Sequence, residues 1–168
     1  MSLSGASIPD NRRGDMNIQL KNVKIYAGLS QETVAFSASL YVDGKKVGEA
    51  RNAGHGGSND VDAHDSDGRW DRDLMDKMET EAATHTWLYE GETHPHSLDS
   101  YIGDLVDTVQ ERRDKQRLCR GKTLAQLPGT EYAEGEWSVF KAKFTPGVAT
   151  SIRTRYGQGT KFLNEEVA

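Results

Sequence analysis

The feature that most constrains the fold is a period-two run that ends in a turn dipeptide. In residues 33–42, TVAFSASLYV, apolar side chains occupy every second position and would share one face of a strand. Asp43-Gly44 follows, and this dipeptide is typical of the two-residue type I′ turn, whose central residues both need a positive φ. The segment KKVGEARN would then return as the second strand of a β-hairpin. With a two-residue loop, Leu40 would lie opposite Val47.

Segments on either side of this hairpin also show regular patterns. Residues 17–26 alternate, with a slip at Lys21-Asn22 that predicts a bulged strand. Apolar residues at helical spacing predict one helix that starts near Asp71 and is broken by EGETHPH. They predict a second helix from the N-cap candidate Ser97 to about Cys119.

The last third of the chain predicts a strand, a helix and another strand. Residues 137–144 alternate, Thr145-Pro146 is typical of a helix start, and residues 161–164 resemble a short strand. The crossover between the two strands would be right-handed if they were parallel neighbours. The predicted fold is therefore α+β: a small antiparallel sheet built on the N-terminal β-hairpin, two central helices and a C-terminal β-α-β element.

The length of 168 residues predicts one domain, which we place at 17–168 after a small, polar, flexible leader at 1–16. That leader has no apolar core of a secretory signal, and no run approaches the roughly 18 apolar residues of a membrane span. The lone Cys119 excludes an internal disulfide framework and a thiolate zinc site. We expect a cytoplasmic protein without a membrane partner.

The net charge of −5 is unevenly distributed. Residues 60–81 carry nine acidic side chains against three basic ones, whereas residues 112–122 carry six basic side chains against one acidic. Such segregation fits two partner surfaces, or simply two solvated faces. In the basic segment, Arg113, Arg117 and Arg120 would share one helix face and are candidates for contact with a macromolecule. Cations at a helix C-terminus are also favoured by the helix dipole without any ligand.

The segment 52–68, NAGHGGSNDVDAHDSDG, is predicted to be a loop with two possible chemistries. Glycine amides can surround an anion, so a phosphate or nucleotide is one candidate ligand, although the P-loop pattern is absent. The candidate ligand-binding residues are Gly54, His55, Gly56, Gly57 and Asn59. A divalent metal is the other possibility. The candidate metal ligands are His55, Asp60, Asp62, His64 and Asp65. A solvated loop remains the third interpretation.

Other candidates for catalysis are weak. Cys119 lies at a cationic helix end that could lower its pKa, but we interpret it as structural. His85 lies on the apolar stripe of its helix and is predicted to be packed. His94 and His96 are interpreted as ordinary surface residues. We identify no catalytic residue.

The stretch LYVDGKKVGEARNAGHGG, with YGQGTKFLN near the end, resembles a group of small uncharacterised phage, prophage and mobile-element proteins. The matching residues are Asp43, Gly44, Gly54, His55, Gly56, Gly57, Gly157 and Asn164. The resemblance covers about a third of the chain and carries no assigned activity. It implies that the protein belongs to a phage or mobile element and acts on or near the machinery of the host.

Two functions follow as hypotheses. The first is a non-enzymatic accessory protein of phage or mobile-element type that binds a host or phage macromolecule, most readily a protein, through its acidic and basic faces. Nucleic acid is a further possible partner. The alternative is a nucleotide- or phosphate-binding or metal-dependent phosphohydrolase-like protein that uses the loop Gly54–Gly57.

Overall fold

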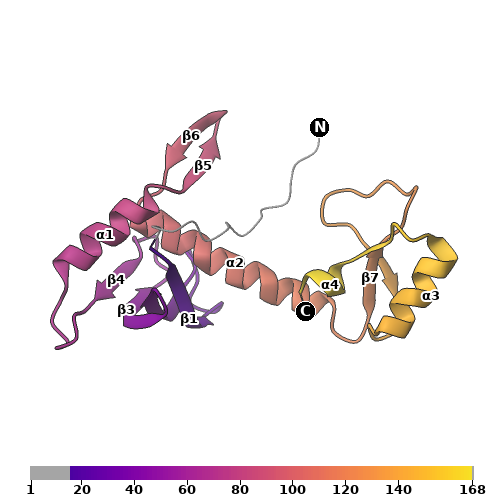
Figure 1. Ribbon diagram of the computed structural model, residues 1–168, viewed down its shortest axis with the longest axis horizontal. Helices are drawn as coiled ribbons and strands as arrows, with labels where there is room; N and C mark the ends of the chain where they lie inside the picture. The colour runs from indigo at the N-terminus through magenta and orange to yellow at the C-terminus, as the bar shows by residue number, and fades with distance from the viewer. Residues whose placement is uncertain (1–15, 168) are drawn as a thin grey trace. The chain divides into compact units, whose positions relative to one another are not determined.

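Residues 16–167 are described by a computed structural model (Figure 1). The flexible leader expected at 1–16 lies, apart from Met16, outside the described residues. The chain divides into two compact units, one up to Asp107 and one from Thr108 onward. Each unit has its own antiparallel sheet, and the α+β class is confirmed. The single domain expected at 17–168 stays a prediction.

The first unit is built on a four-stranded antiparallel sheet with the strand order β1-β2-β3-β4. The hairpin predicted from the period-two run is confirmed: Asp43 and Gly44 both have a positive φ in its two-residue turn. The expected bulge is also present, because Asn22 has φ 54° and the register shifts between Lys21 and Lys24. The strands are β1 (Ile18–Ile25), β2 (Phe36–Val42), β3 (Lys45–Asn52) and β4 (Asp60–Ala63).

The register expected at Leu40 was wrong. Leu40 pairs with Gly48 rather than Val47, because a second bulge shifts β3 by one residue next to the turn. Gly48 is buried against β4, and a Cβ atom there would collide with the backbone carbonyl of Asp62. The bulge therefore places the only glycine of β3 where the backbone of β4 leaves no room for a side chain.

The fourth strand lies within the segment predicted to be a loop. Val61 and Ala63 give too short an alternation to identify a strand among so many acidic residues. The strand forms because it pairs with β3, with Arg51 opposite Asp60 and Gly48 opposite Ala63. Tertiary pairing thus overrides the weak local preference.

Two helices complete the first unit's core, as predicted, but the first ends at Ala82, so His85 lies after it rather than on its apolar stripe. The helix α1 (Arg72–Ala82) is capped by Asp71, whose side chain accepts a hydrogen bond from the Leu74 amide, and it buries Met78 and Ala82. The helix α2 (Leu98–Leu118) starts after Ser97, whose hydroxyl accepts from the Ser100 amide. The buried side chains of α2 are Leu98, Ile102 and Val106.

Between these helices lies a two-stranded hairpin that the sequence did not predict. The strands are β5 (Thr86–Tyr89) and β6 (Glu92–Pro95), joined by Glu90 and Gly91, which both have a positive φ. Figure 1 shows it extending from the ends of α1 and α2. The segment EGETHPH therefore forms a turn and a strand rather than a simple helix break.

The second unit contains a three-stranded sheet with the order β8-β7-β9. Its strands are β7 (Thr123–Gln126), β8 (Ser138–Phe140) and β9 (Lys161–Phe162). Both outer strands run antiparallel to β7. The predicted crossover from β8 through α3 (Pro146–Tyr156) to β9 is present, but β7 lies between its strands, so they are not neighbours.

The C-terminal residues that carried the resemblance have structural roles in this unit. Gly157 ends α3 with φ 117°, and a short helix, α4 (Leu163–Glu166), follows β9. Asn164 is buried, accepts a hydrogen bond from the Leu124 amide at 2.8 Å and donates to the Lys122 carbonyl at 3.0 Å. Ala125, Ala149, Ile152 and Phe162 form a hydrophobic cluster in the core of this unit.

Candidate functional site

The glycine loop between β3 and β4 is held by hydrogen bonds to its neighbours. The Gly54 amide donates to Asn52 Oδ1 at 2.8 Å, and the Gly54 carbonyl accepts from the amides of Gln31 and Glu32. Gly54 has φ +87°, and a Cβ there would collide with the Leu29 carbonyl. Gly54 is thus required by the fold, and its amide is already engaged.

Gly56 and Gly57 differ in their surroundings. The Gly56 amide donates to Thr33 Oγ1 at 3.2 Å, and a Cβ at Gly56 would collide with the Glu32 carboxylate. Gly57 has open space around it, and its carbonyl accepts from Asn52 Nδ2. Two of the three glycine amides expected to bind an anion therefore donate within the protein.

Asn59 connects the loop to the start of α2. Its amide donates to Asp99 Oδ1, and its side-chain Nδ2 donates to the Asp99 carbonyl at 2.9 Å. Its Oδ1 accepts from Asn52 Nδ2. These contacts give Asn59 a structural role.

His55 lines a cavity of about 700 Å³ at the end of the sheet. Its floor includes Phe36, and its rim includes Tyr26 and the ion pair between Arg51 and Asp60, at 2.7 Å. The side chain of His55 is exposed there. Of the residues expected to bind a ligand, His55 and Gly57 line this cavity.

The expected metal ligands do not converge. Asp60 is paired with Arg51, and Asp65 Oδ1 accepts from the amides of Asp67 and Arg69 in a tight turn. His64 is exposed after the end of β4. Across residues 16–167, no three His, Cys, Asp or Glu side chains form a group that could hold a metal ion.

The basic end of α2 lies in the second unit. Arg117 pairs with Asp114 at 2.7 Å, and Lys115 pairs with Glu111 at 2.8 Å. Arg113 has an interaction of its own, and Arg120 lies in the turn after the helix. Acidic residues of the same helix thus offset part of the charge expected to contact a macromolecule.

Cys119 lies in surroundings that disfavour its thiolate form. Burial raises the pKa of the Cys119 thiol, although Lys122 acts in the opposite direction. Desolvation of the thiolate outweighs the nearby cation, so the thiol is less reactive than an unburied one.

The β5–β6 hairpin carries two exposed aromatic side chains, Trp87 and Tyr89. Trp87 lies opposite His94, and Tyr89 lies opposite Glu92, so these four side chains share one side of the hairpin, which we call the aromatic face. The rings of Trp87 and Tyr89 lie 5.8 Å apart, and those of Trp87 and His94 5.4 Å apart. Trp87 is 44% exposed, Tyr89 55% and Leu88, on the opposite side, 72%.

The base of this hairpin is firmly held, in contrast to its tip. The His96 amide donates to the His85 carbonyl at 2.9 Å. The His85 ring stacks on Tyr101 of α2 at 4.6 Å, and the His96 ring lies edge-on to Tyr101 at 6.2 Å. Both ends of the hairpin therefore meet at one aromatic side chain of α2.

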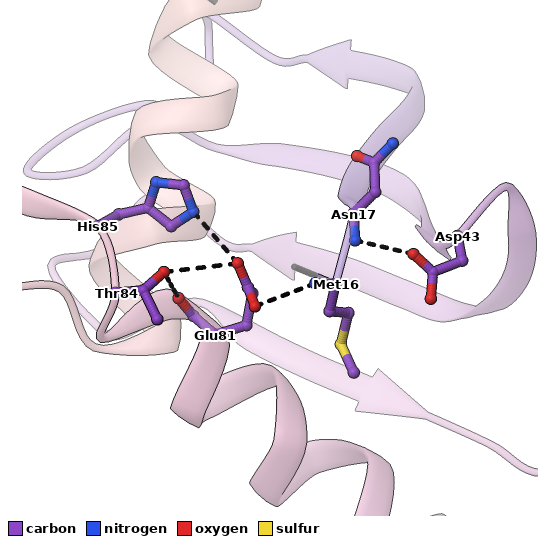
Figure 2. A network of polar contacts seen from close by, with 6 residues as sticks. All are labelled: Met16, Asn17, Asp43, Glu81, Thr84 and His85. Atoms are coloured by element: carbon purple, nitrogen blue, oxygen red, sulfur yellow. Dashed lines mark hydrogen bonds and ion pairs between the residues drawn. The ribbon is translucent and has the colours of Figure 1, made fainter. Parts of the chain in front are cut away.

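Glu81, at the end of α1, anchors the same region (Figure 2). Its mostly buried carboxylate accepts from the Met16 amide at 3.1 Å and lies 3.6 Å from His85 Nε2. The Thr84 hydroxyl donates to the Glu81 carbonyl. Burial, with a smaller contribution from the Glu81 carboxylate, raises the pKa of Tyr101.

His96 was wrongly interpreted as a surface residue, because it is buried at the start of α2. Its Nδ1 lies 3.0 Å from Ser100 Oγ, and its Nε2 lies 3.2 Å from an Asp104 carboxylate oxygen. This resembles a serine, histidine and carboxylate arrangement. The Ser100 hydroxyl also contacts the carbonyl and hydroxyl of Ser97, and these bonds form part of the helix cap.

No protein-family model, curated protein or solved structure matches this chain. Within residues 16–167, every helix is too short or too polar to cross a bilayer.

Proposed function

We propose that this chain is a non-enzymatic accessory protein that binds a partner protein through the β5–β6 hairpin. The observation that carries the proposal is the exposure of Trp87, Leu88 and Tyr89 on a hairpin whose base is fixed. A two-stranded hairpin by itself is marginally stable, and exposed apolar patches mark interaction sites. Trp and Tyr are also the side chains that most often dominate the energy of protein interfaces.

The uneven distribution of charge supports the same proposal. The two compact units carry net charges of opposite sign. Residues 16–107 carry seventeen acidic and eight Lys or Arg side chains, an excess of nine negative charges. Residues 108–167 carry seven acidic and eleven basic side chains, an excess of four positive charges. Two surfaces of opposite sign can select different partners and accelerate their encounter. The phage or mobile-element setting belongs to this proposal and rests on the sequence resemblance.

Site-specific photocrosslinking tests the proposal. A photoreactive phenylalanine analogue is placed at Glu92, which is exposed on the aromatic face opposite Tyr89. The control position is Trp70, which is also exposed in the first unit but lies outside the hairpin. We expect a discrete crosslinked protein in bacterial host cells from position 92 and none from position 70. The crosslink should disappear when Trp87 and Tyr89 are both replaced by Ser. Equal crosslinking from both positions, or none from position 92, would overturn the proposal.

Ligand binding at the glycine loop is the second candidate, favoured by the cavity of about 700 Å³ that His55 and Gly57 line. Native mass spectrometry of the purified protein, with and without EDTA, tests it. This candidate requires a retained nucleotide or metal ion that is lost in His55→Ala. A bare protein mass in both samples counts against tight ligand binding at this loop.

A further inference from the structure

The aromatic face presents carboxylates next to its rings. Glu92 lies directly opposite Tyr89, and Glu90 occupies the adjoining turn. Within residues 16–167, neither glutamate has an ion-pair partner. The tip of the hairpin thus combines π surfaces with uncompensated negative charge.

The surrounding sequence strengthens this negative field. Residues 78–111 contain no Lys or Arg, although they contain eight Asp or Glu. The hairpin lies near the middle of this stretch, in the unit with nine excess negative charges. A cation that approaches the tip therefore meets no nearby positive charge from this part of the sequence.

A planar cation fits both properties at once. A guanidinium group can stack on an indole or phenol ring while its edge donates hydrogen bonds to a carboxylate. Lysine shares the charge but lacks the planar surface and the forked donors. Nucleic acid can also stack on aromatic rings, but its phosphates would be repelled by Glu90 and Glu92.

We propose that the aromatic face binds an extended, arginine-rich segment of the partner protein, with guanidinium groups stacked on Trp87 and Tyr89 and paired with Glu92 and Glu90. This inference rests on the proposed function and adds the chemistry of the partner. The fixed base at His85, His96 and Tyr101 places the rings before binding, which reduces the entropy lost on association.

Calorimetric titration of the full chain with synthetic peptides tests the inference. The probe is a twelve-residue peptide of alternating Arg and Ser. Its matched control has citrulline, the neutral isostere of arginine, at every Arg position, and a third peptide has Lys there. We expect binding of the Arg peptide, weaker binding of the Lys peptide and no binding of the citrulline peptide. Affinity for the Arg peptide should fall with added salt.

Variants locate the binding site. Trp87→Leu should weaken binding of the Arg peptide by about tenfold or more, as expected for a central aromatic contact. Glu92→Gln should weaken it by roughly two- to fivefold, because an exposed ion pair contributes less. Trp70→Leu is the matched control and should leave the affinity unchanged. Circular dichroism spectra establish that each variant is folded.

Three results would overturn the inference: no binding of the Arg peptide, equal binding of the citrulline peptide, or an affinity that Trp87→Leu leaves unchanged. Tighter binding of a single-stranded oligonucleotide, lost in Trp87→Leu, would assign the face to nucleic acid instead. A crosslink at position 92 together with no binding of the Arg peptide would refute only the cationic partner. Loss of both would refute the proposed function as well.

Discussion

The first unit contains two hairpins with the same kind of turn and opposite surroundings. Asp43-Gly44 and Glu90-Gly91 each link two strands through two residues with positive φ. The first hairpin buries Leu40 and Ala50 completely, whereas every residue of β5 is exposed. Turn geometry therefore shows only that a hairpin forms. Its role depends on whether the side chains of its strands are covered by the same chain.

The largest difference between the two hairpins should appear when a leucine of each is truncated. Leu40→Ala should reduce the free energy of unfolding by about 2–5 kcal/mol, because it leaves a cavity in the core. Leu88→Ala should change it by less than about 0.5 kcal/mol, since Leu88 is 72% exposed. Urea denaturation of both variants measures the difference. Similar losses would mean that β5 and β6 are covered by the fold, contrary to our interpretation.

The next largest difference should be in the stability cost of replacing individual glycines of the loop that follows the first hairpin. Gly54→Ala should cost about 1–3 kcal/mol, because it combines positive φ with a backbone collision. Gly57→Ala should stay within about 0.5 kcal/mol, since its φ is not in the left-handed region and the space is open. Thermal denaturation of both variants, with His55→Ala as the neutral control, checks this order. An equal cost at both glycines would contradict the assigned roles.

Replacing the glycine of either turn by alanine should cost a similar local free energy but should affect the global stability of the first unit differently. Gly44→Ala and Gly91→Ala each force an alanine into positive φ, at a cost of about 1–2 kcal/mol. At Gly44 this cost should lower the stability of the first unit. At Gly91 it should fray only the exposed hairpin, which hydrogen exchange of β5 and β6 amides would detect while global unfolding stays unchanged. Global unfolding of the unit by Gly91→Ala would show that the β5–β6 hairpin contributes to the core, contrary to the contrast drawn between the two hairpins.

The smallest effect concerns pH at the hairpin base. Because folding raises the pKa of Tyr101, the tyrosine's contribution to stability is fully present below its unfolded pKa of about 10. This contribution is lost as the pH rises through the higher folded pKa. Tyr101→Phe should therefore lose less stability than the original chain between pH 9 and 11, as urea midpoints would show. Identical pH dependence in both proteins would rule out this role of Tyr101.

The sequence predicted those elements whose local signals are strong and mutually consistent. The run that contains β2 has five alternating apolar residues and ends in a favoured Asp-Gly turn, and α1 and α2 have capping residues and apolar stripes. The elements missed, β4, β5, β6, β7 and α4, are four residues each, too short for a reliable period, and α4 begins within the strand predicted at 161–164. The bulge at Val47 was also not predictable, because it depends on how closely Gly48 approaches Asp62 in another strand.

The sequence pointed to the glycine loop, whereas the site proposed from the structure is the aromatic face, for a related reason. Gly, His and Asp in one loop suggested ligand chemistry, whereas most of those groups are used in hydrogen bonds within the unit. The signal for the aromatic face was present as TWLY, followed at once by Glu-Gly. Three large apolar residues in four positions would normally suggest a buried segment. Whether they are buried depends on tertiary contacts, which the pattern alone does not contain.

The fixed base of the β5–β6 hairpin has a consequence for how such a protein can change. The chain leaves the end of α1 and returns to the start of α2 at adjacent points, which the hydrogen bond from the His96 amide to the His85 carbonyl holds together. The side chains of residues 86–95 can therefore be substituted while the core stays intact. Replacing residues 86–95 with a different ten-residue hairpin would change the binding specificity. Natural sequence variation in this hairpin could alter specificity in the same way when the partner protein changes.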